Sequence, residues 1–290
     1  RWKLKDGRPA LQTPQWRGEP LDGKTLFVFA EQGFGDNIQF IRYLLLLKGR
    51  YPTMRAVYYS GEHLHALFRN SPIAASCDIL LSGDPVPPHD FQSPIMSLPW
   101  RCGTTLANIP DPGIYLAAVP AAVDTWRARL AEIGRPRVGL VWATSETFVY
   151  RSAKTVALDV LASLFEVAGI EWVNLQFGKP AEEIVENGLQ ARIFDPMGQV
   201  RNFSDTAAII ANLDLVIGVD TAVIHLAAAM GRPAWMLDRF DTDWRWLPPR
   251  EDSPWYRTLR IFRQSHFGEW DPVVDRVCAA LTDWQEGIRE

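Results

Sequence analysis

Residues 25–48 read TLFVFAEQGFGDNIQFIRYLLLLK and indicate the fold class of this chain. They begin with an apolar, β-prone run at residues 25–30, and a turn that carries two glycines follows it. Residues 37–48 then place their apolar side chains along one helical face and end before a glycine. Strand, turn and helix in this order make one α/β unit. Because similar units recur along the chain, the sequence predicts an α/β protein with parallel sheets.

The chain contains two such α/β regions. A loop with three prolines runs from residue 103 to residue 122, and the pattern restarts with the apolar run RVGLVW at residues 137–142. A length of 290 residues suffices for two domains of ordinary size. We therefore expect domains of residues 1–122 and 123–290, with residues 1–21 as a lead-in on the domain surface.

Shorter patterns predict three further features of the secondary structure. The apolar residues at 95–98 indicate a buried strand, and residues 157–168 show the spacing of an amphipathic helix. A third helix is expected from residue 204, where Ser204 would cap the first turn.

Composition argues against several classes of protein. The chain has 30 Lys+Arg against 34 Asp+Glu, a net charge of −4 and no basic block, which argues against generic nucleic-acid binding. Charged residues interrupt the most hydrophobic stretch, residues 213–230, so no membrane span is expected. Three scattered cysteines form neither a disulfide framework nor a metal site, and His63 and His65 lack partner ligands. We expect a cytoplasmic protein without a bound metal.

The turn after the first strand carries a candidate catalytic residue. Gly33 and Gly35 would let the backbone approach a ligand closely, and the next helix would direct its first N–H groups at an anion. Asp36 stands at the start of that helix. An aspartate there is either a helix cap or a general base that deprotonates an acceptor hydroxyl.

A second strand–turn–helix junction, at residues 218–227, reads GVDTAVIHLA. Asp220 and Thr221 form the turn, and the helix opens with the small residue Ala222, an arrangement that suits a pyrophosphate. His225 lies one helical turn beyond Thr221. It would either approach the ligand or be a buried core histidine, and the spacing leaves both alternatives open.

The loop at residues 143–155 supplies two cations, Arg151 and Lys154. Either would neutralise phosphate charge on a departing nucleotide, or remain a solvated surface charge. Tyr150 and Lys154 also have the Tyr-x-x-x-Lys spacing of nucleotide-sugar epimerases. The G-x-G-x-x-G fingerprint that such enzymes need is absent from the sequence, which argues against that class.

An aromatic loop at residues 240–246 reads FDTDWRW and contains Asp243 and Trp244. Aromatic rings beside Asp and Arg grip a sugar or a base by stacking and hydrogen bonds. The same rings would equally pin the loop to its own domain.

Five segments together resemble a known family: AEQGFGDNIQFIRYL, SLPWRCGTTL, RVGLVWA, GVDTAVIHLAAAMGRPAW and DWRWLPPREDSPWY. In this order they resemble the glycosyltransferase-like region that ends certain bacterial tetratricopeptide-repeat proteins. That region is similar to the heptosyltransferase family, and some members resemble flagellin glycosyltransferases. The resemblance implies a GT-B fold, in which two Rossmann-like lobes face a cleft and the second lobe holds most of a nucleotide sugar.

The same resemblance assigns roles to residues. Asp36 matches the proposed catalytic base, and residues 220–225 match the stretch that holds the donor diphosphate. Lys154 falls where the family places a basic donor-binding residue, whereas residues 143–151 depart from the Gly-Asn and Asn/Arg-rich run of relatives. The expected substrate- and donor-binding residues are Gly33, Gly35, Gln39, Trp142, Lys154, Gln176, Asp220, Thr221, Ala222, His225, Asp243 and Trp244.

The resemblance also implies an activity. The expected reaction is inverting, needs no metal or other cofactor, and moves a sugar from a nucleotide sugar to a hydroxyl of an acceptor protein, for which flagellin is a candidate. Tetratricopeptide repeats are expected upstream of Arg1 in a longer chain. The alternative is a catalytically inactive module of the same fold that binds a sugar nucleotide or a protein.

Overall fold

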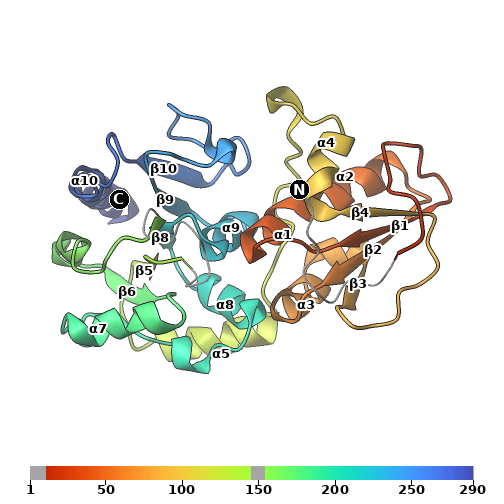
Figure 1. The fold of residues 1–290 in the computed structure, drawn as a ribbon. Helices are drawn as coiled ribbons and strands as arrows, with labels where there is room; N and C mark the ends of the chain where they lie inside the picture. The colour runs from red at the N-terminus through yellow and green to blue at the C-terminus, as the bar shows by residue number, and fades with distance from the viewer. Residues whose placement is uncertain (1–10, 145–153, 290) are drawn as a thin grey trace. The chain divides into compact units, whose positions relative to one another are not determined.

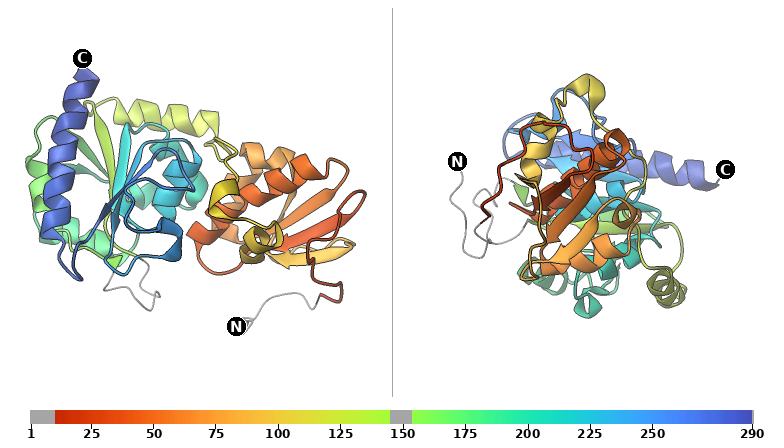
Figure 2. Two further views of the ribbon diagram at one scale, coloured as in Figure 1. Left: turned by 90° about the horizontal axis from the view of Figure 1, so that it is seen from above. Right: turned by 90° about the vertical axis from the view of Figure 1, so that its right-hand side faces the viewer.

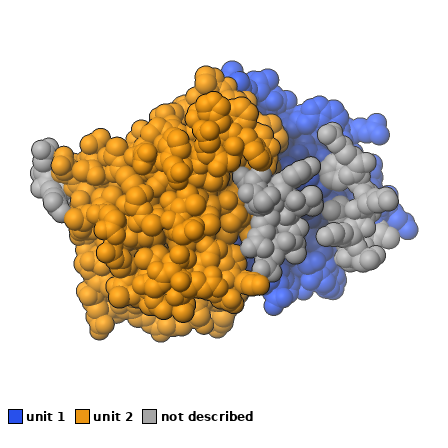
Figure 3. All heavy atoms as spheres, turned by 60° about the vertical axis from the view of Figure 1, so that its left-hand side comes forward, with its two compact units in different colours: residues 1–117, 202–204 blue, residues 118–201, 205–290 orange. Residues whose placement is uncertain are grey.

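The computed structural model describes residues 11–144 and 154–289, with side chains as far as residue 287. The chain divides into two compact units, coloured separately in Figure 3: Arg1–Ala117 with Asn202–Ser204, and Ala118–Arg201 with Asp205–Glu290. The division after Ala117 precedes the expected boundary at residue 122. The reason is that helix α5, Pro120–Leu130, begins at its proline and belongs whole to unit 2.

Unit 1 contains a four-stranded parallel sheet in the order β3-β2-β1-β4 (Figure 1). Its main elements are β1 Thr25–Phe29, α1 Phe34–Phe40, α2 Arg42–Arg50, β2 Arg55–Ser60, α3 Glu62–Arg69, β3 Asp78–Leu81, β4 Phe91–Pro94 and α4 Leu98–Arg101. The helix expected at residues 37–48 is therefore two helices, α1 and α2, and the first of them begins three residues earlier.

The lead-in is more than a surface segment. Gln15 pairs with Gln92 of β4 as an isolated parallel bridge, and the Trp16 N–H donates to the Gln92 carbonyl at 2.8 Å. Trp16 and Leu21 are fully buried in the core of unit 1. The sequence pattern did not show this because a single bridge leaves no alternation of apolar and polar residues.

Unit 2 contains a six-stranded parallel sheet in the order β10-β9-β8-β5-β6-β7. Its main elements are α5, β5 Arg137–Val141, β6 Glu171–Asn174, α7 Glu183–Glu186, β7 Ile193–Phe194, α8 Phe203–Ile210, β8 Leu215–Val219, α9 Ala222–Ala229, β9 Ala234–Asp238, β10 Leu259–Arg263 and α10 Asp271–Arg289. The chain adds β6 and β7 on one side of β5, and β8 to β10 on the other. This order creates a switch point between β5 and β8, where ligands of open α/β sheets bind beyond the carboxyl ends of the strands.

Helices cover both faces of this sheet. Leu215, Ile217 and Val219 of β8 belong to a buried cluster that also includes Val273 and Val277 of α10. Helix α9 contacts β8 and β9, and Figure 2 (left) shows α9 and α10 on opposite sides of the strands. A strand buried on both faces reads as a continuous apolar run, which is why β8 was recognisable in the sequence.

Two expected elements are wrong. Residues 95–98 are not a strand: they form a 3₁₀ turn, Ile95–Ser97, and the start of α4, whereas β4 lies four residues earlier. Ile95 and Leu98 are both buried, and a spacing of three residues places them on one face of a helical turn.

Residues 157–168 do not form an amphipathic α-helix either. They form turns followed by a 3₁₀ helix, Ala162–Glu166. Leu158, Leu161 and Leu164 are all buried, and their three-residue period fits a 3₁₀ helix as well as an α-helix. The expected cap of α8 is also wrong, because the Ser204 N–H donates to the side chain of Asn202 at 2.9 Å.

Gly218 allows β8 to lie close to β5. It pairs with Val141 across the switch point, and a Cβ at position 218 would lie 2.3 Å from the Val141 carbonyl oxygen. That oxygen belongs to a strand in the middle of the sheet, so it cannot move away without distorting the sheet. Glycine is therefore required here for steric reasons.

We predict that Gly218→Ala lowers the free energy of unfolding by about 1–3 kcal/mol, because overpacking against backbone is not relieved by side-chain rotation. Urea unfolding measures the change. Gly287→Ala is the matched control: a Cβ there meets nothing within 4 Å in α10, so its stability should stay the same or rise slightly. Equal stabilities of Gly218→Ala and the wild-type protein would contradict the steric argument.

Candidate functional site

The carboxyl ends of β5 and β8 define the candidate site in unit 2. Trp142–Thr144 follow β5, and Asp220 and Thr221 follow β8. Because the two strands are neighbours and parallel, these residues leave the sheet at the same edge. This is the switch point at which the sequence placed its donor-binding candidates.

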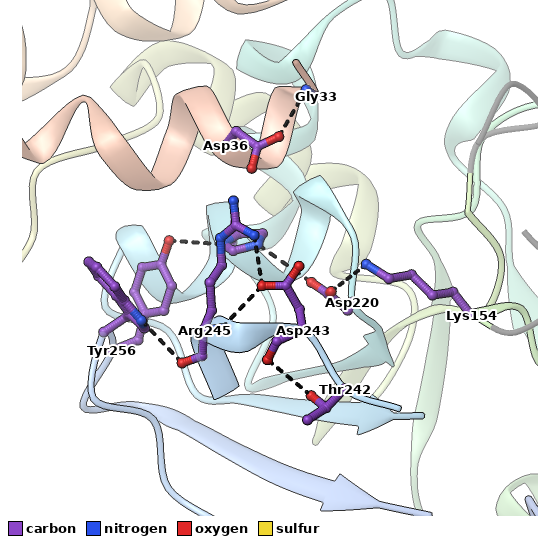
Figure 4. A network of polar contacts seen from close by, with 10 residues as sticks. Gly33, Asp36, Lys154, Asp220, Thr242, Asp243, Arg245 and Tyr256 are labelled. Carbon is purple, nitrogen blue, oxygen red and sulfur yellow. Dashed lines mark hydrogen bonds and ion pairs between the residues drawn. The ribbon is translucent and has the colours of Figure 1, made fainter. Parts of the chain in front are cut away.

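Asp220 is the centre of a buried polar cluster. Its Oδ2 lies 2.6 Å from the Lys154 ammonium, and its Oδ1 lies 3.5 Å from Nε2 of His225. The three side chains are 12%, 13% and 7% exposed respectively, so each pair is largely shielded from solvent. Figure 4 shows Lys154 reaching Asp220 end-on. The structure thus brings Lys154, proposed from a separate loop, together with Asp220 and His225 of the second junction.

The charge state of Asp220 follows from these contacts. Burial raises the pKa of its carboxyl, but the hydrogen bond with His225 and the charge of Lys154 outweigh burial and hold the pKa well below its ordinary value. The carboxylate therefore stays ionised and can only accept hydrogen bonds. It orients the Lys154 ammonium and requires a proton on Nε2 of His225.

His225 is both buried and part of the cluster, so the two alternatives from the sequence are not exclusive. Its Nδ1 lies 3.0 Å from the Tyr256 hydroxyl, and its ring packs against Trp246 with centroids 5.5 Å apart. Tyr256 was not a sequence candidate. It lies 31 residues from His225 in the chain, and only the fold brings the two side chains together.

Thr221 is the residue directly before helix α9, at the N-cap position, but its side chain makes no capping hydrogen bond. Its backbone is extended, and its Oγ1 is buried without a hydrogen-bond partner. The first N–H groups of a helix have no partners within the helix. Ala222 is the first residue of α9 and keeps its first turn free of bulky side chains. A buried, unpartnered hydroxyl at a helix N-terminus is well placed to donate to an anion.

Gln176 and Trp142 stabilise the backbone at the end of β5, beside the candidate site. Oε1 of Gln176 accepts the N–H groups of Trp142 and Ala143 at 3.2 and 2.8 Å, and its Nε2 donates to the carbonyl of Phe177. The Trp142 side chain is fully buried in the core. Both residues therefore fix the backbone at the end of β5, and their direct contact with a donor stays a prediction.

Thr144 follows the same strand, and the sequence had not singled it out. Its Oγ1 is buried and has no hydrogen-bond partner, as in Thr221. Arg151 and Tyr150, with most of the atypical run at 143–151, lie outside the described residues.

The aromatic loop after β9 is anchored to unit 2 at one end and exposed at the other. Asp243 caps the 3₁₀ turn Trp244–Trp246 by accepting the Arg245 N–H, and it also pairs with the Arg245 guanidinium at 2.8 Å (Figure 4). The Trp244 side chain stays 57% exposed, with its ring edge-on to Trp255. The loop therefore packs on its own domain and still presents one aromatic ring to solvent.

Asp36 lies in unit 1, at the third position of α1 rather than at its cap. Its Oδ2 accepts the Gly33 N–H at 2.9 Å, as in a capping box, and its side chain is only partly buried (Figure 4). Neither Gly33 nor Gly35 has a positive φ; the left-handed residue of this turn is Gln32, with φ 58°. Gln39 is fully buried, and its contact with a ligand stays a prediction.

Two searches of the described residues gave no candidates. No group of three or more His, Cys, Asp or Glu side chains within residues 11–144 and 154–289 is placed to hold a metal ion. Among the same residues, no helix combines the length and the apolar character needed to cross a bilayer.

Part of unit 2 matches a known enzyme family. Residues 168–237, which run from before β6 into β9, match glycosyltransferase family 9 (heptosyltransferase). Protein FlbA of Caulobacter vibrioides is 29% identical over 310 residues, an alignment that covers 95% of this chain and 50% of FlbA. The chain thus spans about half the length of this curated relative.

Solved structures show the same fold. A family 9 glycosyltransferase from Veillonella parvula gives a TM-score of 0.59 at 13% identity, over 86% of this chain and 88% of that one. The E. coli ADP-heptose lipopolysaccharide heptosyltransferase II gives 0.59 at 14% identity, over 91% and 99%. E. coli heptosyltransferase WaaC, solved with ADP-2-deoxy-2-fluoro heptose, gives 0.52 at 13% identity, over the same shares. The expected α/β, GT-B fold is confirmed.

We predict that Lys154→Met destabilises the protein by about 3–5 kcal/mol at pH 7, because it leaves the buried Asp220 carboxylate without its cation. The folded pKa of Asp220 lies below the ordinary value of 3.8, so its stabilising effect is complete above that pH. The effect is lost as the pH falls toward the folded pKa. The variant should therefore lose less stability than the wild-type protein when the pH falls below about 4.

Chemical denaturation at several pH values measures both effects. Lys24→Met is the matched control, since the pair between Lys24 and Asp90 is exposed, with side chains 50% and 38% accessible. The control should change stability little. A Lys154→Met variant that behaves like the control at every pH would show that the cluster carries no buried charge.

Proposed function

We propose that this chain is a glycosyltransferase that moves a sugar from a nucleotide sugar to a hydroxyl of an acceptor protein. The observation that carries the proposal is the unpartnered Thr221 hydroxyl at the start of α9, beside the buried pair of Asp220 and Lys154. An anionic ligand would give this hydroxyl and the first N–H groups of α9 their missing partners. The family 9 match at residues 168–237 includes Asp220 and Thr221 and supports a phosphate-bearing donor.

In the proposed reaction, the acceptor oxygen attacks the anomeric carbon on the face opposite the nucleotide. A bond forms between that carbon and the acceptor oxygen, and the bond to the donor phosphate breaks. Asp36 takes the proton of the acceptor hydroxyl as a general base. The leaving phosphate gains negative charge, which the helix N-terminus, Thr221 and the Lys154 ammonium stabilise. Configuration is inverted, and no metal or other cofactor takes part in the proposal.

Asp220 and His225 position other groups in this proposal. The ionised Asp220 carboxylate repels phosphate, so its value lies in holding the Lys154 ammonium and the His225 Nε2–H in place. Tyr256 fixes the His225 ring from its other nitrogen. Trp244 offers an exposed ring on which a base or sugar can stack.

The acceptor and cellular context are further parts of the proposal. We infer a cytoplasmic enzyme that follows tetratricopeptide repeats in a longer chain and acts on flagellin. The support is the sequence resemblance, together with the fact that FlbA is about twice as long as its aligned part.

We predict that Thr221→Val weakens nucleotide-sugar binding about tenfold or more, because one hydrogen bond to a charged phosphate is lost. Stability should not fall, since the hydroxyl has no partner in the free protein. Thermal-shift and calorimetric titrations with CMP-, CDP-, UDP-, GDP- and ADP-linked sugars identify the donor and measure the change.

Thr258→Val provides the control for this experiment. Thr258 also has a buried Oγ1 without a partner, but it precedes β10 and lies at the amino end of the sheet. The Thr258→Val variant should bind the donor like the wild-type protein. Equal donor affinities of Thr221→Val and Thr258→Val would contradict a phosphate site at α9.

We predict that Asp36→Asn abolishes transfer while leaving donor affinity unchanged, because an amide accepts the Gly33 N–H but cannot take a proton. Product is measured as a mass increase of flagellin incubated with the donor found above. Glu62→Gln, in the first turn of α3, is the control and should transfer normally. Transfer by Asp36→Asn at the wild-type rate would exclude Asp36 as the base. A wild-type protein that binds the donor but modifies no hydroxyl would favour the inactive binding module.

A further inference from the structure

Arg239 leaves the sheet next to the candidate phosphate site. It directly follows β9, which is the neighbour of β8 in the sheet. Val219 pairs with Leu237 in the parallel register, so Thr221 and Arg239 each lie two residues beyond the last paired position. Both residues therefore emerge at the same edge, from adjacent strands.

The guanidinium of Arg239 is largely buried, and its hydrogen bonds are incomplete among the described residues. Its side chain is only 13% exposed, and its Nε and Nη1 are buried without a hydrogen bond. The carboxylate of Asp241 lies 3.3 Å from Nε outside hydrogen-bond geometry, and that side chain is 55% exposed. Buried N–H groups without acceptors are costly, and a buried charge is costlier still.

The neighbouring arginine shows that this environment can satisfy a guanidinium. Arg263, on β10, donates from Nε to Asp238 at 2.7 Å, and its two terminal nitrogens donate to the carbonyls of Arg250 and Trp246. Every nitrogen of that side chain is used inside the protein. Arg239 differs because, among the described residues, its Nε and Nη1 have no hydrogen-bond acceptor.

The backbone around Arg239 is held rigidly all the same. Asp238 is fixed by Arg263, and its carbonyl accepts the Gln264 N–H at 2.9 Å. On the other side, the Phe240 N–H donates to Oε1 of Gln264 at 3.1 Å. Arg239 is thus presented from a fixed backbone with two N–H-bearing nitrogens that lack acceptors among the described residues, and a guanidinium donates charge-assisted hydrogen bonds to oxyanions.

We propose that Arg239 binds an oxyanion of the donor, which rests on the proposed function of the site. The oxyanion displaces the exposed Asp241 and supplies the acceptor that the Nε–H lacks. A donor phosphate and a carboxylate on the transferred sugar share this chemistry. The position of Arg239 level with Thr221 makes a phosphate the first expectation.

Isothermal titration of the full chain with inorganic pyrophosphate, UDP-glucose and UDP-glucuronate tests the proposal. Arg239→Gln should lower pyrophosphate affinity about tenfold or more, as expected for a lost charged hydrogen-bond pair. Arg239→Lys should restore only part of the loss, because an ammonium cannot form the fork. If Arg239→Gln leaves pyrophosphate binding intact but weakens UDP-glucuronate binding specifically, the oxyanion is the sugar carboxylate.

Arg260→Gln is the matched control, since Arg260 lies within β10 with a side chain 48% exposed. It should bind all three probes like the wild-type protein. Thermal unfolding separates a binding role from a structural one: Arg239→Gln should unfold at the wild-type temperature or above it, because it removes a buried charge whose ion-pair partner, Asp241, is exposed.

Two results would overturn the proposal. If Arg239→Gln binds all three probes with wild-type affinity, Arg239 is no oxyanion ligand, while the proposed function of the site stands. If the wild-type protein binds none of the three probes nor any sugar nucleotide of the donor panel, both this inference and the proposed function fail.

Discussion

The close approach of β8 to β5 at Gly218 is the constraint on which the rest of unit 2 depends. A side chain there would meet the carbonyl of Val141, so only glycine lets the two strands form the centre of the sheet. These strands also end side by side at one edge of the sheet. This glycine thus allows the strand pairing that brings Thr144, Asp220 and Thr221 to the same edge of the sheet.

Four residues at this edge of the described sheet have polar groups without hydrogen-bond partners. Thr144, Thr221, Arg239 and Gln264 each follow a different parallel strand at its carboxyl end, and each has a buried side-chain atom without a hydrogen bond. Folded proteins normally satisfy such groups, because an unpaired buried donor costs free energy. Their position at one edge of the described sheet supports the proposed donor site there.

The sequence predicted the central strands and failed where the pattern was ambiguous. Strand β8 and helix α9 were found because a run of apolar residues ends in a polar turn. The α-helix predicted at residues 157–168 was wrong because a three-residue period occurs in both α- and 3₁₀ helices. The strand predicted at residues 95–98 was wrong because two apolar residues near a proline fit a strand as well as a helical turn.

The candidate site was predictable only in part. Asp220, Thr221 and His225 stand close together in the chain, so local spacing placed them correctly beside one another. The contact of Tyr256 with His225, and the lack of hydrogen-bond acceptors for Nε and Nη1 of Arg239, depend on segments that are distant in the sequence. Sequence spacing carries no information on whether a buried arginine finds an acceptor, because that outcome is set by tertiary packing.

The lead-in of unit 1 has a consequence for the solution behaviour of the protein. Strand β4 lies at the border of its sheet, and an uncovered border strand offers free N–H and C=O groups to other chains. The residues around Gln15 occupy that border: Pro14 and Trp16 exchange backbone hydrogen bonds with Gln92, and the Trp16 side chain locks the segment down. The segment therefore protects β4 from intermolecular β-pairing. A fragment that starts after Trp16 would leave the edge of β4 exposed and would tend to aggregate.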